Sequence, residues 1–399
     1  MGKHVIILGA GASYTSGYPL AADLRVILSS TEAFKKYVEG KTSQHNQKFR
    51  DKLLQLFAYN EPAIRLFREG GFATVDEFSF LARKRLKTQV ANMKRLMTVV
   101  LALHNPETEY KKNGANTTTT GFESSDYYPF VQKLFSSDLH GLRADMTVLS
   151  YNYDSYLDFL LYRALSCRKN VAGQAVISDS VARVTSGFDQ RNANALKAND
   201  EFCLLKLHGT SAVPLLPVVQ GQPNEYLTYR EVFLDQKFFH THVEQLSALD
   251  SPVFFPWELI GEDGKILPEQ EFREHEQAGG NNLDYSRAGK LLYPICRAIW
   301  ERARQEICKA ETISFVGMSF HHFLKGGFEF LFGPRGNHLP NLVFVDPQCL
   351  KTKGGVNAPI VERARRMLTQ ASPSILGGTG STNMRFYDTF ANFIQEEMA

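Results

Sequence analysis

The stretch GAGAS, at residues 9–13, follows a short apolar run and has residue types that can bind a phosphate group. Gly9 and Gly11 permit the tight turn and close backbone approach that a pyrophosphate needs, and a helix beginning near Ser13 would point free N–H groups at the anion. Tyr14 replaces the third glycine of GxGxxG, however, and no acidic residue ends a second strand about 20 residues on. A strand-to-helix turn with a packing role alone is the alternative.

A second polar group follows the apolar run 146–150. Asn152 and Asp154 stand two residues apart just before an apolar helical stretch. A carboxamide and a carboxylate in this position could hold an amide or a ribose hydroxyl. The alternative is helix capping, because Asn and Asp are common N-cap residues.

His208 forms a third candidate, since it follows the run 202–207 and precedes Gly209. An imidazole titrates in the range wanted of a general base, although a lone histidine can equally be structural. Two further runs end in small or acidic residues that can contact ribose or phosphate. These residues are Gly317, Ser319 and Asp346.

All five groups stand at the ends of nearly continuous apolar runs, which is the pattern of parallel strands buried on both faces. The runs cover residues 4–8, 146–150, 202–207, 312–316 and 341–345. Helical stripes lie between them, within residues 20–28, 157–165 and 291–307, where Pro294 predicts a first turn or a kink. We therefore predict an α/β fold, a Rossmann-like doubly wound parallel sheet whose carboxyl edge gathers the polar groups.

Two long intervals exceed what a minimal sheet requires, so we predict one domain over residues 1–399 with two insertions. Residues 30–145 have a mostly helical pattern and contain a polar segment, 105–126, which predicts a mobile loop. Residues 211–290 are rich in aromatic side chains, notably in the stretch 226–239. This second interval is predicted to be a lid or an oligomer surface.

Composition excludes several classes of protein. The chain has 45 Lys and Arg residues against 42 Asp and Glu residues, a net charge of +3, without a long basic run. Direct nucleic-acid binding is therefore not indicated. No apolar stretch approaches the roughly 20 residues that cross a bilayer, which predicts a cytoplasmic protein without membrane contact. The five scattered cysteines predict reduced thiols and no structural metal site.

The order of the five groups, GAGxS, NxD, HG, GxS and a strand ending in an acid, resembles the sirtuin family, and especially its bacterial zinc-free branch of NAD-consuming enzymes. The resemblance covers residues 1–28, 146–165, 202–210 and 312–346. It leaves both long intervals unexplained.

The resemblance implies a role for each matched position, with NAD as substrate. It implies that Gly9, Ala10, Gly11 and Ser13 cradle the phosphates, and that Asn152 and Asp154 lie in the nicotinamide and ribose pocket. It further implies that His208 is the catalytic base, acting with Asn152. Gly317 and Ser319 would hold the ribose or phosphate on the adenosine side, and Asp346 would lie near the adenosine.

The sequence also departs from the sirtuin deacylases. Their zinc module is built from two CxxC pairs, which this chain lacks, and their GIPDFR segment is replaced here by GYPLAADLR. The resemblance therefore implies an NAD glycohydrolase of the kind used in bacterial anti-phage defence. A protein deacylase or ADP-ribosyltransferase is one alternative, and a non-enzymatic NAD sensor is another.

A free NAD hydrolase would poison its own cell, so we expect its activity to be gated. Self-assembly into a homo-oligomer, or an activating partner such as a nucleic-acid-sensing ATPase, would provide the gate. No second sensor domain is recognisable in the sequence, which favours an outside partner.

Overall fold

The computed structural model describes residues 2–41, 47–103, 125–135, 142–166, 202–211, 253–272, 285–335, 340–349, 358–373 and 383–398. The predicted loop within residues 105–126, the aromatic stretch 226–239 and Cys167 lie wholly or mostly outside these ranges.

A six-stranded sheet with every strand parallel forms the centre of the molecule. Its strands are β1 (Lys3–Leu8), β2 (Met146–Ser150), β3 (Cys203–Lys206), β4 (Ala310–Val316), β5 (Asn341–Val345) and β6 (Met384–Tyr387), in the spatial order β3-β2-β1-β4-β5-β6. This is the strand order of dinucleotide-binding α/β folds, so the predicted doubly wound sheet is confirmed. The order reverses between β1 and β4, which makes their carboxyl ends the switch point of the sheet.

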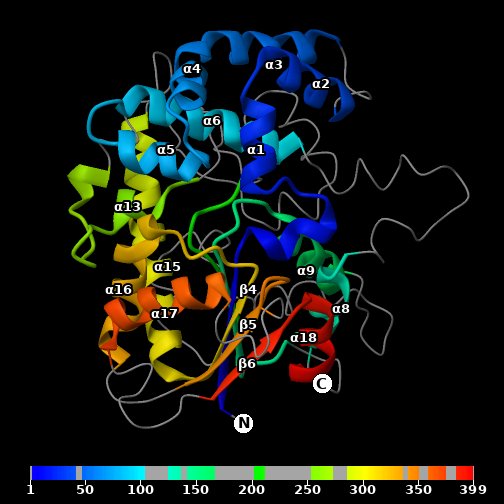
Figure 1. Ribbon diagram of the computed structural model, residues 1–399, viewed down its shortest axis with the longest axis vertical. Helices are drawn as coiled ribbons and strands as arrows, with labels where there is room; N and C mark the ends of the chain where they lie inside the picture. Colours follow the sequence, from blue (N-terminus) through cyan, green and yellow to red (C-terminus); the bar gives the residue numbers. More distant parts are fainter. Residues whose placement is uncertain are drawn as a thin grey trace, which may run out of the picture.

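Helices cover both faces of the sheet, as the continuous burial of its central strands requires. Figure 1 shows α15 (Tyr285–Lys309), α16 (Lys325–Phe332) and α17 (Pro359–Ala371) on one face. The other face carries α8 (Tyr127–Lys133), α9 (Tyr156–Ser166) and α18 (Phe390–Glu397). Helix α15 begins at Tyr285, before the predicted stripe 291–307, so Pro294 lies inside the helix and the prediction that it could mark the first turn is wrong.

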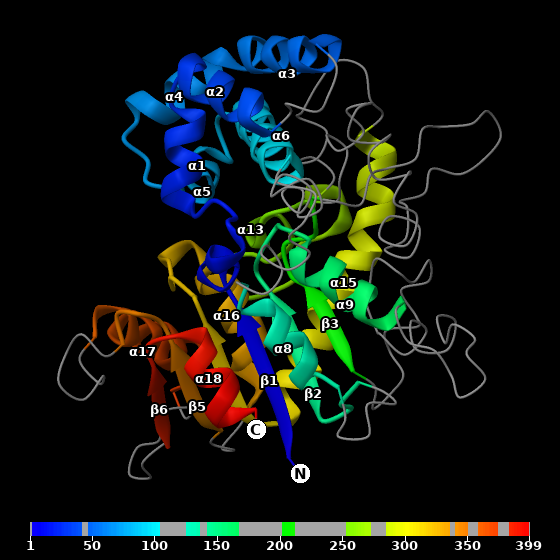
Figure 2. The same ribbon diagram turned by 90° about the vertical axis from the view of Figure 1, so that its right-hand side faces the viewer.

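The predicted helical insertion forms a layer beyond the carboxyl ends of the strands (Figures 1 and 2). The helices of this layer are α2 (Thr31–Lys41), α3 (Gln47–Tyr59), α4 (Glu61–Glu69), α5 (Val75–Ala82) and α6 (Lys87–Leu103), together with α1 (Ala21–Leu28), which precedes the predicted insertion. Helix α8 lies within the predicted bounds 30–145 but covers the sheet instead (Figure 1). Every side chain from Leu96 to Leu103 is buried, so the second half of α6 is the centre of this layer. The layer closes over the edge of the sheet where the candidate residues stand.

An ion pair joins the helical layer to the segment after β3. The ammonium group of Lys94 in α6 lies 3.0 Å from both carboxylate oxygens of Glu258, in the short helix α13 (Pro256–Leu259), and both side chains are buried. Glu258 also accepts a hydrogen bond from the backbone N–H of Phe255 at 2.8 Å. A buried carboxylate with its donors in place fixes how α6 lies against α13.

Two local features differ from prediction. The stretch after β1 forms a 3₁₀ helix, η1 (Ala10–Ser16), that ends at Gly17, and the α-helix α1 begins only at Ala21. Strand β6 was not predicted, because its four residues are each half-buried at the sheet edge and form no continuous apolar run.

No described helix has both the length and the apolar character that a membrane span requires.

Candidate functional site

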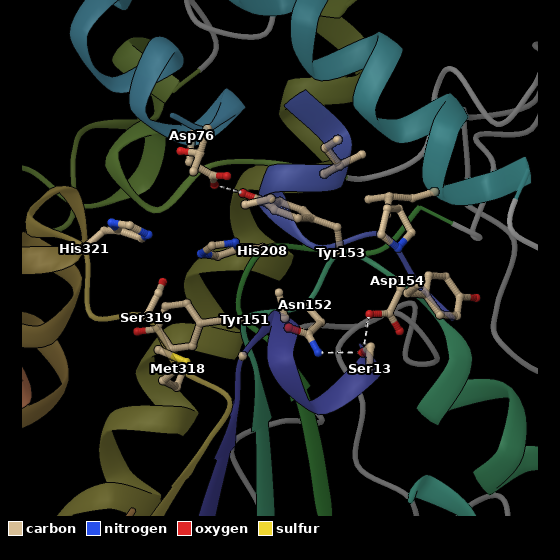
Figure 3. Close-up of a pocket in the computed structure, with 18 of the residues that line it drawn as sticks. Ser13, Asp76, Tyr151, Asn152, Tyr153, Asp154, His208, Met318, Ser319 and His321 are labelled. Atoms are coloured by element: carbon tan, nitrogen blue, oxygen red, sulfur yellow. Dashed lines mark hydrogen bonds between the residues drawn. The ribbon is translucent and has the colours of Figure 1, made fainter. Parts of the chain in front are cut away.

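A cavity opens at the switch point of the sheet, between the carboxyl ends of its strands and the helical layer (Figure 3). The space between its walls is about 770 Å³ when it is counted out to the open mouth. Seven of the ten predicted site residues line it: Gly9, Ala10, Ser13, Asn152, Asp154, His208 and Ser319. Parallel strands end at one edge, so residues far apart in the sequence meet here.

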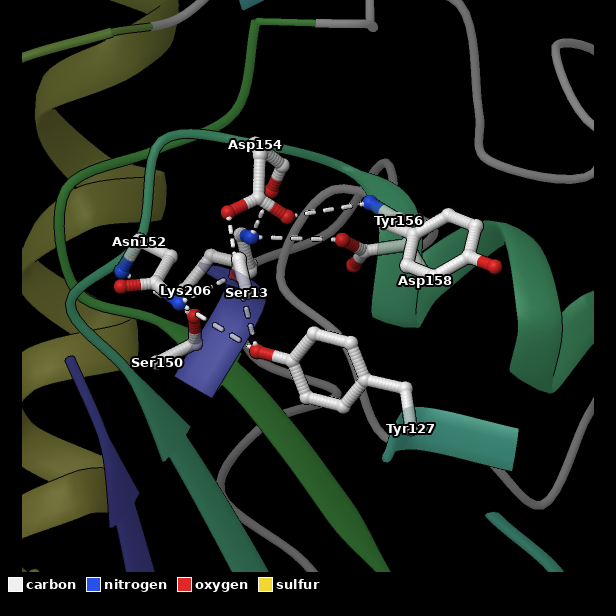
Figure 4. A network of polar contacts seen from close by, with 8 residues as sticks. All are labelled: Ser13, Tyr127, Ser150, Asn152, Asp154, Tyr156, Asp158 and Lys206. Carbon is white, nitrogen blue, oxygen red and sulfur yellow. Dashed lines mark hydrogen bonds and ion pairs between the residues drawn. The ribbon is translucent and has the colours of Figure 1, made fainter. Parts of the chain in front are cut away.

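Ser13 joins the loops after β1 and β2 through its hydroxyl group (Figure 4). The Ser13 Oγ donates to Asp154 Oδ2 at 2.7 Å, and therefore must accept from the Asn152 amide Nδ2 at 2.9 Å. The Tyr127 hydroxyl lies 3.1 Å from Ser13 Oγ and 3.3 Å from Asn152 Nδ2. This network sets the orientation of the Asn152 amide, with its nitrogen held and its oxygen Oδ1 left over.

Below this network lies a buried cation. Lys206, at the end of β3, donates to the backbone carbonyl of Asp154 and lies 3.3 Å from Asp158 Oδ2. Lys206 and Asp158 are both almost completely buried. A buried ion pair stabilises a fold only when each charged group has good partners. Lys206 therefore holds the 152–154 loop in place from beneath.

His208 follows β3 and lies between two tyrosine rings. The ring centroids of Tyr151 and Tyr153 are 5.0 and 4.7 Å from that of the histidine. Gly209 has a φ of 74°, a left-handed conformation that turns the chain directly after the histidine. Burial, and next the nearby Lys206 ammonium, lower the pKa of His208 from 6.5 to about 3. The imidazole is therefore neutral at physiological pH.

Several buried polar atoms at this cavity have no hydrogen-bond partner within the described ranges. They are Asn152 Oδ1, both ring nitrogens of His208 and the Tyr151 hydroxyl oxygen. Buried polar atoms in proteins are nearly always paired, because an unmet donor or acceptor costs about 1–3 kcal/mol. Water or a polar ligand in the cavity would supply the missing partners.

The glycines of the first motif pack against the loop after β4. A Cβ atom on Gly9 would lie 2.5 Å from the Gly317 carbonyl oxygen, and one on Gly11 would lie 2.8 Å from the Gly317 Cα. Gly317 itself has a φ of 62°, and its own Cβ would meet the Ala12 nitrogen at 2.5 Å. These glycines let two backbones touch, which is the packing role weighed as the alternative for this motif.

Three predicted residues do not line the cavity. Gly11 donates its N–H to the Gly317 carbonyl, so the two glycines contact each other. Asp346 accepts a hydrogen bond from the Gln348 N–H at 2.8 Å in a turn after β5. Contact of these three residues with a cofactor stays a prediction.

The cavity is also lined by Asp76, Tyr151, Tyr153 and His321, which were not singled out from the sequence. The two tyrosines flank Asn152 in the YNYD stretch, and their spacing was a usable signal. Nothing local marks Asp76, which comes from α5 in the helical layer. His321 follows Phe320, whose φ of 51° is unusual for a bulky side chain and marks a constrained loop.

The described residues contain no cluster of three or more side chains suited to hold a metal ion. The described cysteines, Cys203, Cys296, Cys308 and Cys349, form no disulfide bond with one another. Comparison with known proteins adds no assignment to this geometry. No protein-family model matches the chain, and no curated protein matches it either.

Proposed function

We propose that this protein is an NAD glycohydrolase, which cleaves the bond between nicotinamide and ribose and passes the ribosyl group to water. The observation that carries the proposal is the set of buried polar atoms of Asn152 and His208 at the switch-point cavity that have no hydrogen-bond partner among the described residues. The order of the motifs, which resembles zinc-free sirtuin-like enzymes, supplies the substrate. A dinucleotide suits a cavity at this place in an α/β sheet.

Asn152 is suited to hold the leaving group or the incoming water. Its nitrogen is committed to Ser13 and Tyr127, so its oxygen Oδ1 is the atom it offers to the cavity. That oxygen can accept a hydrogen bond from the nicotinamide amide or from a water molecule. Either contact orients the reactants for a transition state that resembles an oxocarbenium ion.

His208 is suited to accept a proton. The C1′–N bond breaks with its electron pair leaving on nicotinamide, water forms the new C1′–O bond, and one proton must be removed. A neutral imidazole can take it from the water or from a ribose hydroxyl. A pKa of about 3 makes the free imidazole a weak base. The proton therefore leaves late, when the cationic ribosyl centre has acidified the attacking or adjacent hydroxyl.

Such an activity requires control, and we place the protein among regulated effectors of bacterial anti-phage defence. The gate is self-assembly or an activating partner, such as a nucleic-acid-sensing ATPase. Light scattering of the purified chain, alone and with the product of a neighbouring gene, tests this part of the proposal. A strictly monomeric protein with full partner-independent hydrolysis would refute the gate and leave the chemistry standing.

Nicotinamide release from NAD, followed by chromatography with and without that partner, tests the chemistry. We expect His208→Ala and Asn152→Ala each to lower the rate about a hundredfold to ten-thousandfold. His322→Ala is the matched control, because His322 is exposed and does not line the cavity. Wild-type turnover in His208→Ala would overturn the mechanism. ADP-ribose found on a protein would favour a transferase, and NAD binding without cleavage would favour a sensor.

A further inference from the structure

The carboxylate of Asp76 is a polar group of the cavity that the chemistry above does not use. Asp76 lies in the first turn of α5, after the N-cap residue Thr74. The capping contacts are made by its neighbour, because the Glu77 N–H donates to Thr74 Oγ1 at 2.9 Å and Glu77 Oε2 accepts from the Ala73 N–H at 2.7 Å. Asp76 therefore makes neither of these capping contacts, although an acidic residue at a helix start often makes one.

Asp76 is instead tied to the loop that carries Asn152. The Tyr153 hydroxyl donates to Asp76 Oδ1 at 2.7 Å, and the Tyr153 ring packs beside His208. Figure 3 shows the Asp76 carboxylate directed from α5 toward Tyr153, with His208 next to that ring. The helical layer thus contributes a side chain to the same cavity.

Among the residues that the structure describes, Tyr153 supplies the one side-chain hydrogen bond to the Asp76 carboxylate, and no cation lies within ion-pair distance of it. Burial raises the pKa of Asp76, and the hydrogen bonds from Tyr153 and from the residue's own backbone N–H act against this shift. Burying a carboxylate that has no cation beside it costs free energy unless a ligand supplies hydrogen-bond donors. The donors that match a carboxylate on a nucleotide are the hydroxyl groups of its ribose.

We propose that Asp76 is a substrate-binding residue whose carboxylate accepts a hydroxyl group of the ribose attached to nicotinamide. This inference rests on the proposed function, since it identifies the ribose by its nearness to Asn152 and His208. Tyr153 is the positioning residue, because it holds one oxygen of the carboxylate and leaves the other for the substrate.

Calorimetric titration with two ligands that are not cleaved tests the inference. ADP-ribose carries the ribose in question, and ADP lacks it. We expect Asp76→Ala to weaken the binding of ADP-ribose about tenfold to a hundredfold, the effect of losing a charged hydrogen bond, and to leave the binding of ADP within twofold. Asp76→Asn, which keeps an acceptor oxygen, should lie between Asp76→Ala and the wild type.

Glu77→Gln is the matched control, because glutamine can still accept from the Ala73 N–H and the residue does not line the cavity. It should bind both ligands as the wild type does. If Asp76→Ala weakens the binding of both ligands equally, or of neither, the inference is overturned. The proposed function still stands in that case, provided that the wild type cleaves NAD. A wild type that binds neither ligand and cleaves no NAD would instead overturn the proposed function, and this inference with it.

Discussion

The backbone N–H of Gly11 donates a hydrogen bond to the carbonyl oxygen of Gly317, 3.1 Å away. The loops after β1 and β4 therefore touch through backbone atoms at the switch point of the sheet. This contact shapes one wall of the cavity, where Gly9 and Met318 lie on either side of the junction. Any side chain added at the junction must push the two loops apart.

We accordingly expect Gly11→Val to lower the free energy of unfolding by roughly 1–3 kcal/mol, the usual cost of overpacking. The added Cβ would meet the Gly317 Cα at 2.8 Å, and backbone cannot move aside as a flexible side chain can. Urea unfolding measures the change. Gly40→Ala is the control, since no atom beyond its chain neighbours and the nearby α2 backbone lies within 4 Å of the added Cβ, and it should leave stability unchanged or raise it. Equal stability of Gly11→Val and wild type would show that the junction is loose.

Replacing Ser13 should remove a hydrogen bond that orients the Asn152 amide. Ser13→Ala removes both the acceptor at 2.9 Å from Asn152 and the donor at 2.7 Å to Asp154. We expect nicotinamide release to fall about tenfold to a hundredfold, as expected for the loss of hydrogen bonds to a charged group. Tyr127→Phe should cost less, because its contacts of 3.1 and 3.3 Å are longer.

The control for Ser13→Ala is Ser16→Ala, on the same 3₁₀ helix. Ser16 bonds to Ser125 at 2.6 Å and does not line the cavity. Turnover of Ser13→Ala equal to that of Ser16→Ala would mean that the amide orientation does not depend on Ser13.

Loss of the Lys206 ammonium should destabilise the fold strongly. Lys206→Met leaves the Asp158 carboxylate buried without the ammonium now 3.3 Å away, which typically costs 3–5 kcal/mol. The double variant Lys206→Met with Asp158→Asn should recover much of that loss, because the uncompensated charge is gone. Chemical unfolding of the two single variants and the double variant measures the coupling.

An exposed ion pair provides the comparison. The Lys35 ammonium lies 4.0 Å from Glu39 Oε1, and about half of each side chain is exposed. Lys35→Met should therefore change stability by no more than about 0.5 kcal/mol. Additive effects at Lys206 and Asp158 would show that the buried pair is not coupled.

The buried histidine at the site should make stability depend on pH. The pKa of His208 is about 3 in the folded protein and 6.5 as its ordinary value, so between these pH values the unfolded chain binds a proton that the folded chain does not. The free energy of unfolding should therefore fall as the pH drops below 6.5, with a slope that approaches about 1.4 kcal/mol per pH unit.

The variant His208→Gln should reduce this slope, and His322→Gln should not, because His322 is exposed. His4 adds a similar contribution, since burial lowers its pKa to about 4, and that contribution is common to both variants. Urea unfolding at pH 7.5 and 5.5 gives the comparison. An identical slope in His208→Gln and wild type would mean that the imidazole titrates normally in the folded state.

The sequence by itself determined the sheet and much of its polar edge. Five of the six strands were predictable, because a strand buried on both faces must be apolar along its whole length. Asn152, Asp154 and His208 could be placed at the carboxyl edge for the same reason, since each comes within four residues of the end of such a run. Strand β6 escaped prediction because an edge strand is covered on fewer sides and needs no continuous apolar run.

Only the tertiary structure decided which polar residues share the cavity. Asp76 comes from a helix 77 residues before its partner Tyr153, and no local pattern reports a contact between elements that meet only in the folded chain. The structure likewise brought Gly11 against Gly317 and placed Asp346 in a turn away from the cavity. Periodicity records which face of an element is buried, whereas the packing of the helical layer on the sheet selects the side chains that line the space between them.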